Sequence, residues 1–256
     1  MLKGLVGLVT GGASGLGRAT VQRFINQGGK AVILDLPISD GANFAESLGP
    51  DALFVPANVT IEEDVVKALE LTKEKFGRLD VAVNCAEIGG LFKTYNFNKS
   101  QPHKLQDFYD VLAVNVEGTF NVTRLAVGLI GQNAPGSDGL RGVIINTASI
   151  SAYEGQVGQV AYAASKGAIV GMTLPLARDL AQQGIRVAAI APGMIDTPLL
   201  DPLPEKVKNY IAAFQVPCPK RLGFPEEYAM LVETIVSNPL FNGEVIRLDG
   251  AMRLPP

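Results

Sequence analysis

Short apolar runs alternate with longer helical patterns along nearly the whole chain, and few folds are compatible with that order. The runs that read as buried strands are 5–9, 31–35, 53–57, 79–84, 142–147 and 185–191. One helical pattern follows the first strand and ends at 27, and three others cover 61–76, 105–128 and 160–182. This rhythm predicts an α/β fold: a doubly wound, Rossmann-type parallel sheet of about seven strands with helices on both faces. With 256 residues and no internal repeat, we expect one domain over 1–256.

Composition narrows the possible partners. Apolar residues make up 47% of the chain and charged residues only 18%, below the usual quarter, which favours surface hidden in subunit contacts. The net charge of -3 argues against direct nucleic-acid binding over the whole domain. No apolar run reaches the ~18 residues of a membrane span, so we expect no membrane partner. The first nine residues are interpreted as a strand rather than a signal peptide, and they give no targeting information.

A glycine-rich turn follows the first strand. Gly11, Gly15 and Gly17 lie between that strand and a helical pattern, where backbone N–H groups and the positive end of a helix can hold a pyrophosphate. Their spacing, Gly-x-x-x-Gly-x-Gly, differs from the commoner Gly-x-Gly-x-x-Gly fingerprint. By itself this turn is weak evidence for a nucleotide.

The second strand ends in an acid. Asp35 follows Gly17 at close to the ~20-residue spacing of a carboxylate that binds the adenosine ribose. Alternatively, Asp35 is a polar residue that merely ends the strand. No cation follows it, and Ser14 in the glycine turn is uncharged, so a 2′-phosphate would meet no positive partner. NAD is therefore predicted over NADP.

Tyr162 and Lys166 form an i, i+4 pair on a predicted helix. An ammonium ~4 Å from a phenol would lower the pKa of the phenol by at most about three units, against the opposing effect of burial. A phenol shifted in that way can act as a general base near neutral pH. The alternative is a chance pair on a helix surface. Because His103 is the only histidine, we predict no Ser-His-Asp triad and no metal site.

Three segments interrupt the alternation: 89–104, 131–141 and 192–225. Long irregular stretches in a compact sheet protein are usually binding loops or lids. The third segment begins just past a strand, at the sheet edge where such folds bind ligands. We expect the substrate loops near 89–104 and 192–225.

Together these motifs resemble the short-chain dehydrogenase/reductase family over essentially the whole chain. The matching pieces are Thr10-Gly11-x-x-x-Gly15-x-Gly17, Asn84-Cys-Ala86, Asn115, Ser149, Tyr162-x-x-x-Lys166 and Pro192-Gly193. The resemblance implies that Tyr162 is the general base and that Lys166 lowers its pKa and holds the nicotinamide ribose. It also implies that Ser149 hydrogen-bonds the substrate oxygen and that Asn115 holds water in a proton relay behind Lys166.

The same resemblance assigns residues to the two ligands. The cofactor set is Gly11, Ser14, Gly15, Leu16, Gly17, Asp35, Asn58, Val59, Cys85, Ala86, Tyr162, Lys166, Ile195 and Thr197; the substrate set is Ser149, Gln156 and Tyr162. Three of these have simpler interpretations. Ser149 is alternatively a strand-end hydroxyl, Asn115 a helix cap and Cys85 a small packed residue rather than a nucleophile.

A nearer resemblance points to one branch of the family. Residues 142–149, 154–159, 167–180 and 242–250 resemble the 3-hydroxyacyl-CoA dehydrogenases that also act on hydroxysteroids. That resemblance implies oxidation of short or branched hydroxyacyl-CoA chains with NAD, a homotetramer, and a mitochondrial location in an animal, otherwise a cytoplasmic one. The alternatives are a related carbonyl or 3-oxoacyl reductase, and a scaffold subunit of a mitochondrial tRNA-processing complex.

Two positions depart from the family pattern. Asn58 stands where an aspartate usually meets the adenine amino group, and we expect little change because an amide oxygen also accepts that bond. Glu87 stands where glycine is nearly always found. Its carboxylate would either face the pyrophosphate and repel it or turn outward to pair with a lysine such as Lys93. A glutamate would also be strained if the position required positive φ.

Overall fold

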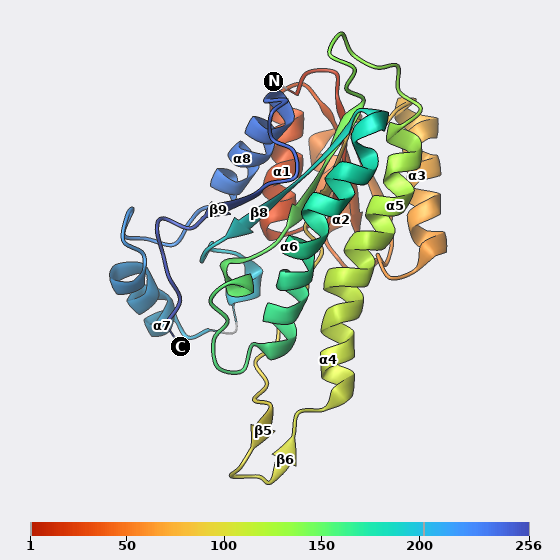
Figure 1. The fold of residues 1–256 in the computed structure, drawn as a ribbon. Coiled ribbons are helices and arrows are strands. Elements are labelled where there is room, and N and C mark those ends of the chain that lie inside the picture. Colours follow the sequence, from red (N-terminus) through yellow and green to blue (C-terminus); the bar gives the residue numbers. More distant parts are fainter. Residues whose placement is uncertain (1, 202, 256) are drawn as a thin grey trace.

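A seven-stranded parallel sheet forms the centre of the protein (Figure 1). The computed structural model describes residues 2–201 and 203–255. The strand order is β3-β2-β1-β4-β7-β8-β9, and every pairing is parallel. The strands are β1 (Val6–Thr10), β2 (Lys30–Asp35), β3 (Ala52–Pro56), β4 (Val81–Asn84), β7 (Gly142–Thr147), β8 (Ile185–Pro192) and β9 (Val245–Leu248). The predicted fold class is confirmed.

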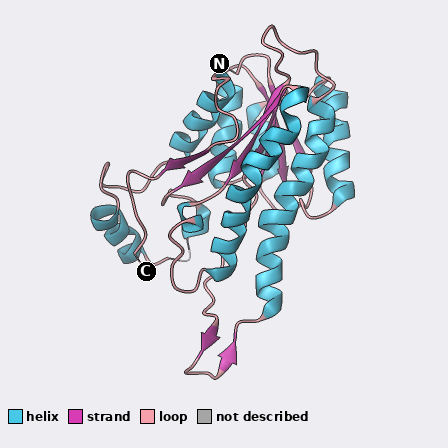
Figure 2. Ribbon diagram, viewed as in Figure 1, coloured by secondary structure: helices cyan, strands magenta, loops and turns pink. Residues whose placement is uncertain are grey.

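Helices cover both faces of this sheet (Figure 2). One layer contains α1 (Gly15–Asn26), α2 (Gly41–Leu48) and α8 (Pro225–Ser237), and the other contains α3 (Glu62–Phe76), α5 (Thr119–Ile130) and α6 (Val160–Leu180). Phe24 and Tyr228 are fully buried in the first layer, and Val65 and Val122 in the second. Because both faces are covered, the central strands are continuous apolar runs without alternating polar positions.

The sheet reverses its winding direction next to β1. β2 pairs with one side of β1 and β4 with the other, so Thr10 lies beside both Leu34 and Asn84. Asn84 in turn lies beside Asn146. In such sheets the crevice at the carboxyl ends of the strands next to the switch point is the usual ligand site.

One predicted helix is divided in the structure. The pattern at 105–128 forms α4 (Leu105–Leu112), a π-helical segment (Ala113–Gly118) and then α5. A π-helical turn inserts an extra residue and is frequent at functional sites. In this protein it contains Asn115, which is fully buried.

Two segments expected to be irregular contain short elements. A two-stranded hairpin, β5 (Tyr95–Asn96) and β6 (Gln101–Pro102), projects from the body of the molecule within 89–104 (Figure 1). The helix α7 (Glu205–Tyr210) lies within 192–225 and continues into a π-helical turn. Both corrections concern elements of two to six residues, which carry too little periodicity to be recognised in a sequence.

The helix α6 is the longest of the helices that the structure describes. Within the described part of the chain, 160–183 is the one helical stretch that could cross a membrane by length and composition alone. A helix that covers a sheet passes the same test, and α6 lies against β8 and α4. It buries Lys166 on the face toward the sheet.

Candidate active site

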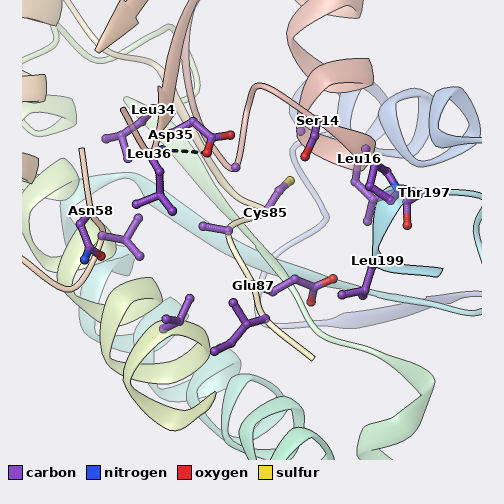
Figure 3. Close-up of a pocket in the computed structure, with 18 of the residues that line it drawn as sticks. Ser14, Leu16, Leu34, Asp35, Leu36, Asn58, Cys85, Glu87, Thr197 and Leu199 are labelled. Carbon is purple, nitrogen blue, oxygen red and sulfur yellow. Dashed lines mark hydrogen bonds between the residues drawn. The ribbon is translucent and has the colours of Figure 1, made fainter. Parts of the chain in front are cut away.

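A cleft of about 300 Å³ opens at the carboxyl edge, beside the glycine turn (Figure 3). The backbone of this turn comes close to its neighbours. A Cβ at Gly17 would lie 2.2 Å from the Gly11 carbonyl oxygen, and Gly11 has φ +61 with Ala86 N 2.9 Å from its Cβ position. Only glycine therefore fits at these positions, and the backbone of the turn lies close to that of its neighbours. Because the first N–H groups of a helix lack intrahelical partners, this geometry fits a dinucleotide pyrophosphate.

Asp35 is held in place by backbone groups. Ala13 N donates to its Oδ2 at 2.9 Å. Leu36 N donates to Oδ1 of Asp35 at 2.8 Å, the bond that is dashed in Figure 3. Among the described residues that line this cleft, Asp35 and Glu87 carry charge and neither arginine nor lysine is present. Arg18, just past the glycine turn, pairs with Asp40 and stacks on Phe44. Asp35 therefore presents its carboxylate to the cleft without a cationic partner there.

Most of the predicted cofactor residues meet in this cleft. Its walls include Gly11, Ser14, Gly15, Leu16, Gly17, Asp35, Asn58, Val59, Cys85, Ala86 and Thr197. The Asn58 amide oxygen already accepts hydrogen bonds from the Thr60 N–H and hydroxyl groups, at 3.1 and 2.9 Å. An adenine amino group would have to share that oxygen, which the sequence did not indicate. Ile195, Tyr162 and Lys166 are not among the residues that line this cleft.

Cys85 is packed rather than reactive. Burial raises the pKa of its thiol to about 11, although Tyr228 and Thr147 hydrogen-bond to the sulfur. A thiol with so high a pKa is almost entirely protonated near neutral pH. This agrees with the interpretation of Cys85 as a small packed residue.

A second and larger cavity, of about 580 Å³, adjoins the first. Ser149, Tyr162 and Gln156, the three predicted substrate residues, all line it, and so does Ile195. Both segments predicted as substrate loops contribute walls, through residues 89–91 and residues between 192 and 215. Leu16, Glu87, Thr197 and Leu199 line both cavities and mark their junction.

Lys166 is buried beneath this junction and lines neither cavity. Its ammonium donates to the Thr147 carbonyl oxygen at 2.8 Å and lies 5.5 Å from the centroid of the Tyr162 ring. It also forms an ion pair with the Glu87 carboxylate. The helical i, i+4 spacing thus brings Lys166 and Tyr162 together as predicted, but the positive charge has another partner.

The pKa of Tyr162 is raised well above its usual value, which is the opposite of the sequence-based expectation. The main cause is burial of the phenol; the second is the negative charge of Glu87, whose Oε2 accepts a hydrogen bond from the phenol at 3.3 Å. A hydrogen bond with Ser149 opposes the shift. The expectation was wrong for this state of the protein because burial of the phenol, together with the negative charge of Glu87, outweighs the effect of the nearby ammonium.

The structure contradicts one of the two arrangements predicted for Glu87, whereas repulsion of the pyrophosphate stays a prediction because the side chain lines the cofactor cleft. Glu87 turns its side chain inward to Lys166 and Tyr162, so the predicted outward pairing with Lys93 is wrong. Its backbone is also unstrained, because Ser100 and Ala251 are the only non-glycine residues with positive φ in the described part of the chain. The carboxylate points toward Lys166 and Tyr162 of α6 rather than outward.

Asn115 and Ser149 are both fixed by local hydrogen bonds. The amide of Asn115 accepts from Ile88 N at 2.9 Å and donates to Ile88 O and Ser165 Oγ, each at 3.0 Å. It therefore holds the segment just after Glu87. The Ser149 hydroxyl accepts from Ser151 N at 3.1 Å and caps a short 3₁₀ turn.

Comparison with known proteins identifies the family. Residues 6–208 match the short chain dehydrogenase family. The chain belongs to this family. It is therefore an oxidoreductase, and because short chain dehydrogenases use NAD or NADP, its cofactor is a nicotinamide dinucleotide.

Several relatives of this short chain dehydrogenase are similar over their full length. The human and Drosophila melanogaster proteins named 3-hydroxyacyl-CoA dehydrogenase type-2 are 63% and 57% identical; both alignments cover 100% of this chain, and 97% and 100% of the relatives. A solved structure of that name from Mycobacterium avium is 41% identical, with a TM-score of 0.92 over 99% of this chain and 97% of that one. A 3-ketoacyl-(acyl-carrier-protein) reductase from Brucella melitensis, complexed with NADH, is 32% identical, with a TM-score of 0.85 over 99% and 100%. The resemblance to the hydroxyacyl-CoA branch is thereby confirmed.

Sequence reasoning missed three polar groups that support the site. The Thr10 hydroxyl accepts from Cys85 N and Ala86 N at 3.0 and 3.1 Å, and so fixes the turn before Glu87. Thr147 joins Lys166 to Tyr228, through its carbonyl oxygen and through a hydroxyl contact of 2.8 Å. The position of Thr10 and Thr147 at strand ends was an available signal, whereas Tyr228 lies on a helix that the sequence analysis did not predict.

Proposed function

We propose that this enzyme oxidises the 3-hydroxyl group of 3-hydroxyacyl-CoA esters to a ketone with NAD, and that hydroxysteroids are a second substrate class. The observation that carries the proposal is the larger cavity, in which Ser149 and Tyr162 face a mainly apolar space of about 580 Å³. Such a space suits an acyl chain or a steroid. The names of the full-length relatives support the acyl-CoA class.

The roles of the residues follow from their positions. Tyr162 takes the proton of the alcohol, and Ser149, which is hydrogen-bonded to Tyr162, orients the substrate oxygen. Lys166 supplies the positive charge that favours the phenolate and donates hydrogen bonds to the nicotinamide ribose. Asn115 fixes the neighbouring Ile88 backbone. Its part in a proton relay, holding water behind Lys166, stays a prediction. The bound nicotinamide would accept hydride from the substrate carbon.

NAD is the proposed cofactor rather than NADP. Asp35 and the absence of a cation among the described residues of the cleft support this choice, because a 2′-phosphate would meet only negative charge. The remaining predicted residues, from the glycine turn to Thr197, would line the same dinucleotide. Turnover with NAD and NADP at equal concentration tests the choice; a preference for NADP would reverse it.

Reduction of a 3-oxoacyl group is a second candidate, for one reason. A raised pKa keeps Tyr162 protonated, which is the form that donates a proton to a carbonyl. Assays of purified protein should therefore run in both directions, with hydroxyacyl-CoA esters, steroid alcohols and the matching ketones. Turnover of steroids without turnover of any acyl-CoA ester would overturn the leading proposal, and no turnover at all would favour the scaffold alternative.

We further propose that the whole chain acts as one domain and assembles as a homotetramer. Two separate surfaces carry exposed apolar side chains, Leu105, Tyr109 and Phe120 on one side and Met230 and Leu240 on the other. A closed tetramer needs more than one kind of two-fold contact, and these surfaces suit two of them. Light scattering of the native protein and of Met230→Glu tests this, with a dimer expected for the variant. For an animal source we propose a mitochondrial location, to be checked by cell fractionation.

A further inference from the structure

Glu87 lies between the catalytic lysine and the space where ligands bind. Its carboxylate pairs with Lys166, and its side chain lines both cavities, whereas Lys166 lines neither. The Lys166 side chain is only 3% exposed and that of Glu87 is 14% exposed. The carboxylate therefore covers the ammonium from the side on which a cofactor would approach.

The ion pair between Glu87 and Lys166 compensates a buried charge in the cofactor-free protein. A buried ammonium is costly unless an opposite charge and hydrogen bonds compensate it. Lys166 has the Thr147 carbonyl oxygen and the Glu87 carboxylate, and among the described residues lining the two cavities no other cation competes for Glu87. Each of the two groups thus depends on the other.

We propose that Glu87 competes with the cofactor for Lys166: it covers the ammonium in the free enzyme and must turn away before the nicotinamide ribose can reach it. This inference rests on the proposed nicotinamide cofactor and on the proposed contact between its ribose and Lys166. It makes Glu87 a determinant of cofactor affinity that acts through Lys166.

The charged groups around Tyr162 also support competition between Glu87 and the cofactor for Lys166. Glu87 faces the phenol from the end of β4, Lys166 from α6 and Ser149 from the end of β7. Cys85, which precedes Glu87 by two residues, contacts Tyr228 of α8 instead. Of these, Lys166 is the cation and Glu87 the anion. While the two are paired, the carboxylate raises the pKa of Tyr162; once Glu87 turns away, the unpaired ammonium acts on the phenol in the opposite direction.

A simpler possibility is that Glu87 repels the cofactor pyrophosphate. The two ideas differ in which part of the cofactor Glu87 affects. Competition for Lys166 involves the nicotinamide ribose and leaves the adenosine end untouched. Repulsion of the pyrophosphate affects every ligand that carries a pyrophosphate.

The test compares NADH with ADP, which has the pyrophosphate but lacks the nicotinamide ribose. Both are titrated by calorimetry into the native protein and Glu87→Gln, which keeps the shape of the side chain and removes its charge. Glu74→Gln, an exposed position on α3, controls for the change in net charge. Glu87→Gly, which removes the whole side chain, provides a second variant if the glutamine form is poorly folded.

Competition predicts that Glu87→Gln binds NADH roughly tenfold more tightly, as expected when a partly buried ion pair no longer has to be broken. It predicts unchanged ADP affinity and unchanged binding in Glu74→Gln. The cofactor-free variant should also melt about 2–8 °C lower, because Lys166 has lost its counter-charge, and NADH should stabilise it more than the native protein.

Three results would overturn the inference. Equal NADH affinity in the native and variant proteins would remove Glu87 from cofactor binding, and an equal gain for NADH and ADP would indicate pyrophosphate repulsion. Failure of every form to bind NADH or NADPH would overturn the proposed cofactor and this inference with it. The first two results leave the proposed function intact.

Discussion

The two ends of the cofactor cleft each contain a carboxylate, but the two are held in different ways. Asp35 accepts hydrogen bonds from the N–H groups of Ala13 and Leu36. Glu87 is held by the side chains of Lys166 and Tyr162. The two backbone N–H groups that hold Asp35 take no part in the proposed reaction, so Asp35 is preorganised. The partners of Glu87, in contrast, are the proposed catalytic groups. A carboxylate held by catalytic groups must be exchangeable if those groups are to work.

The largest expected effect is at the catalytic end. Tyr162→Phe keeps the ring but removes the group that exchanges a proton, so turnover should fall by ~10²–10⁴-fold while NADH still binds. Steady-state rates and NADH titration of the same preparation measure both quantities. Near-normal turnover would remove Tyr162 from the mechanism. The different ways in which Asp35 and Glu87 are held would then have no bearing on catalysis.

The next effect is at the preorganised end. Asp35→Ala removes a charge-assisted hydrogen bond to the ribose worth ~1.5–3 kcal/mol, so the NAD over NADP preference should narrow by roughly 10- to 150-fold. The ratio of kcat/KM values for the two cofactors measures it. Asp51→Ala, an exposed position before β3, is the matched control and should leave the ratio unchanged.

A smaller effect concerns pH. Oxidation needs the deprotonated phenol, and the charge of Glu87 raises the pKa of Tyr162, so the rise of kcat/KM with pH should move to lower pH in Glu87→Gln, by about one unit. Because kcat/KM reports the free enzyme and kcat the complex, the kcat profile should move less. Equal shifts in both profiles would show that Glu87 keeps its position after the cofactor binds.

The smallest expected effect concerns Cys85, which lines the same cleft as Asp35 and Glu87. Since the pKa of Cys85 is about 11, its thiolate is about a thousandfold less abundant than its thiol at pH 8. A thiol reagent should therefore modify Cys218, which is exposed, long before Cys85. Cys218→Ser should lose the fast reaction, and Cys85→Ala should keep near-native turnover. Rapid labelling of Cys85 would show that the cleft wall opens more than the structure indicates.

The central strands of the sheet were predictable because they are buried on both faces, whereas the half-buried edge strand β9 was not among the predicted runs. The run 31–35, for example, is apolar up to its final residue, Asp35, and therefore marks a buried strand directly. The helices α2 and α8 were not predicted, since α2 is short and α8 follows a long irregular segment. The π-helical segment was not predictable either: it changes the register of one helix without changing the type of residue that the helix contains.

The sequence predicted which residues form the site, but not which of their side chains pair with one another. Glycine spacing and the Tyr162–Lys166 motif identify residues that share a sheet edge or a helix face, and most of them do meet in the two cavities. The choice of Glu87 between Lys93 and Lys166 depends on how β4 ends relative to α6. That relation is tertiary, and so is the burial of the phenol that, with the charge of Glu87, raises the pKa of Tyr162.

The two hydrogen bonds between Asn115 and the Ile88 backbone affect how fast the Glu87 side chain can leave Lys166. It fixes the chain just after Glu87, while Thr10 fixes the chain just before it. Departure of the carboxylate is then a side-chain rotation with no loop movement, and such rotations take picoseconds to nanoseconds at exposed positions. Even if burial slows the rotation a thousandfold, to about a microsecond, it remains far faster than a typical turnover of ~10 s⁻¹. Glu87 can therefore lower the occupancy of the cofactor site without ever limiting the rate of the catalytic cycle.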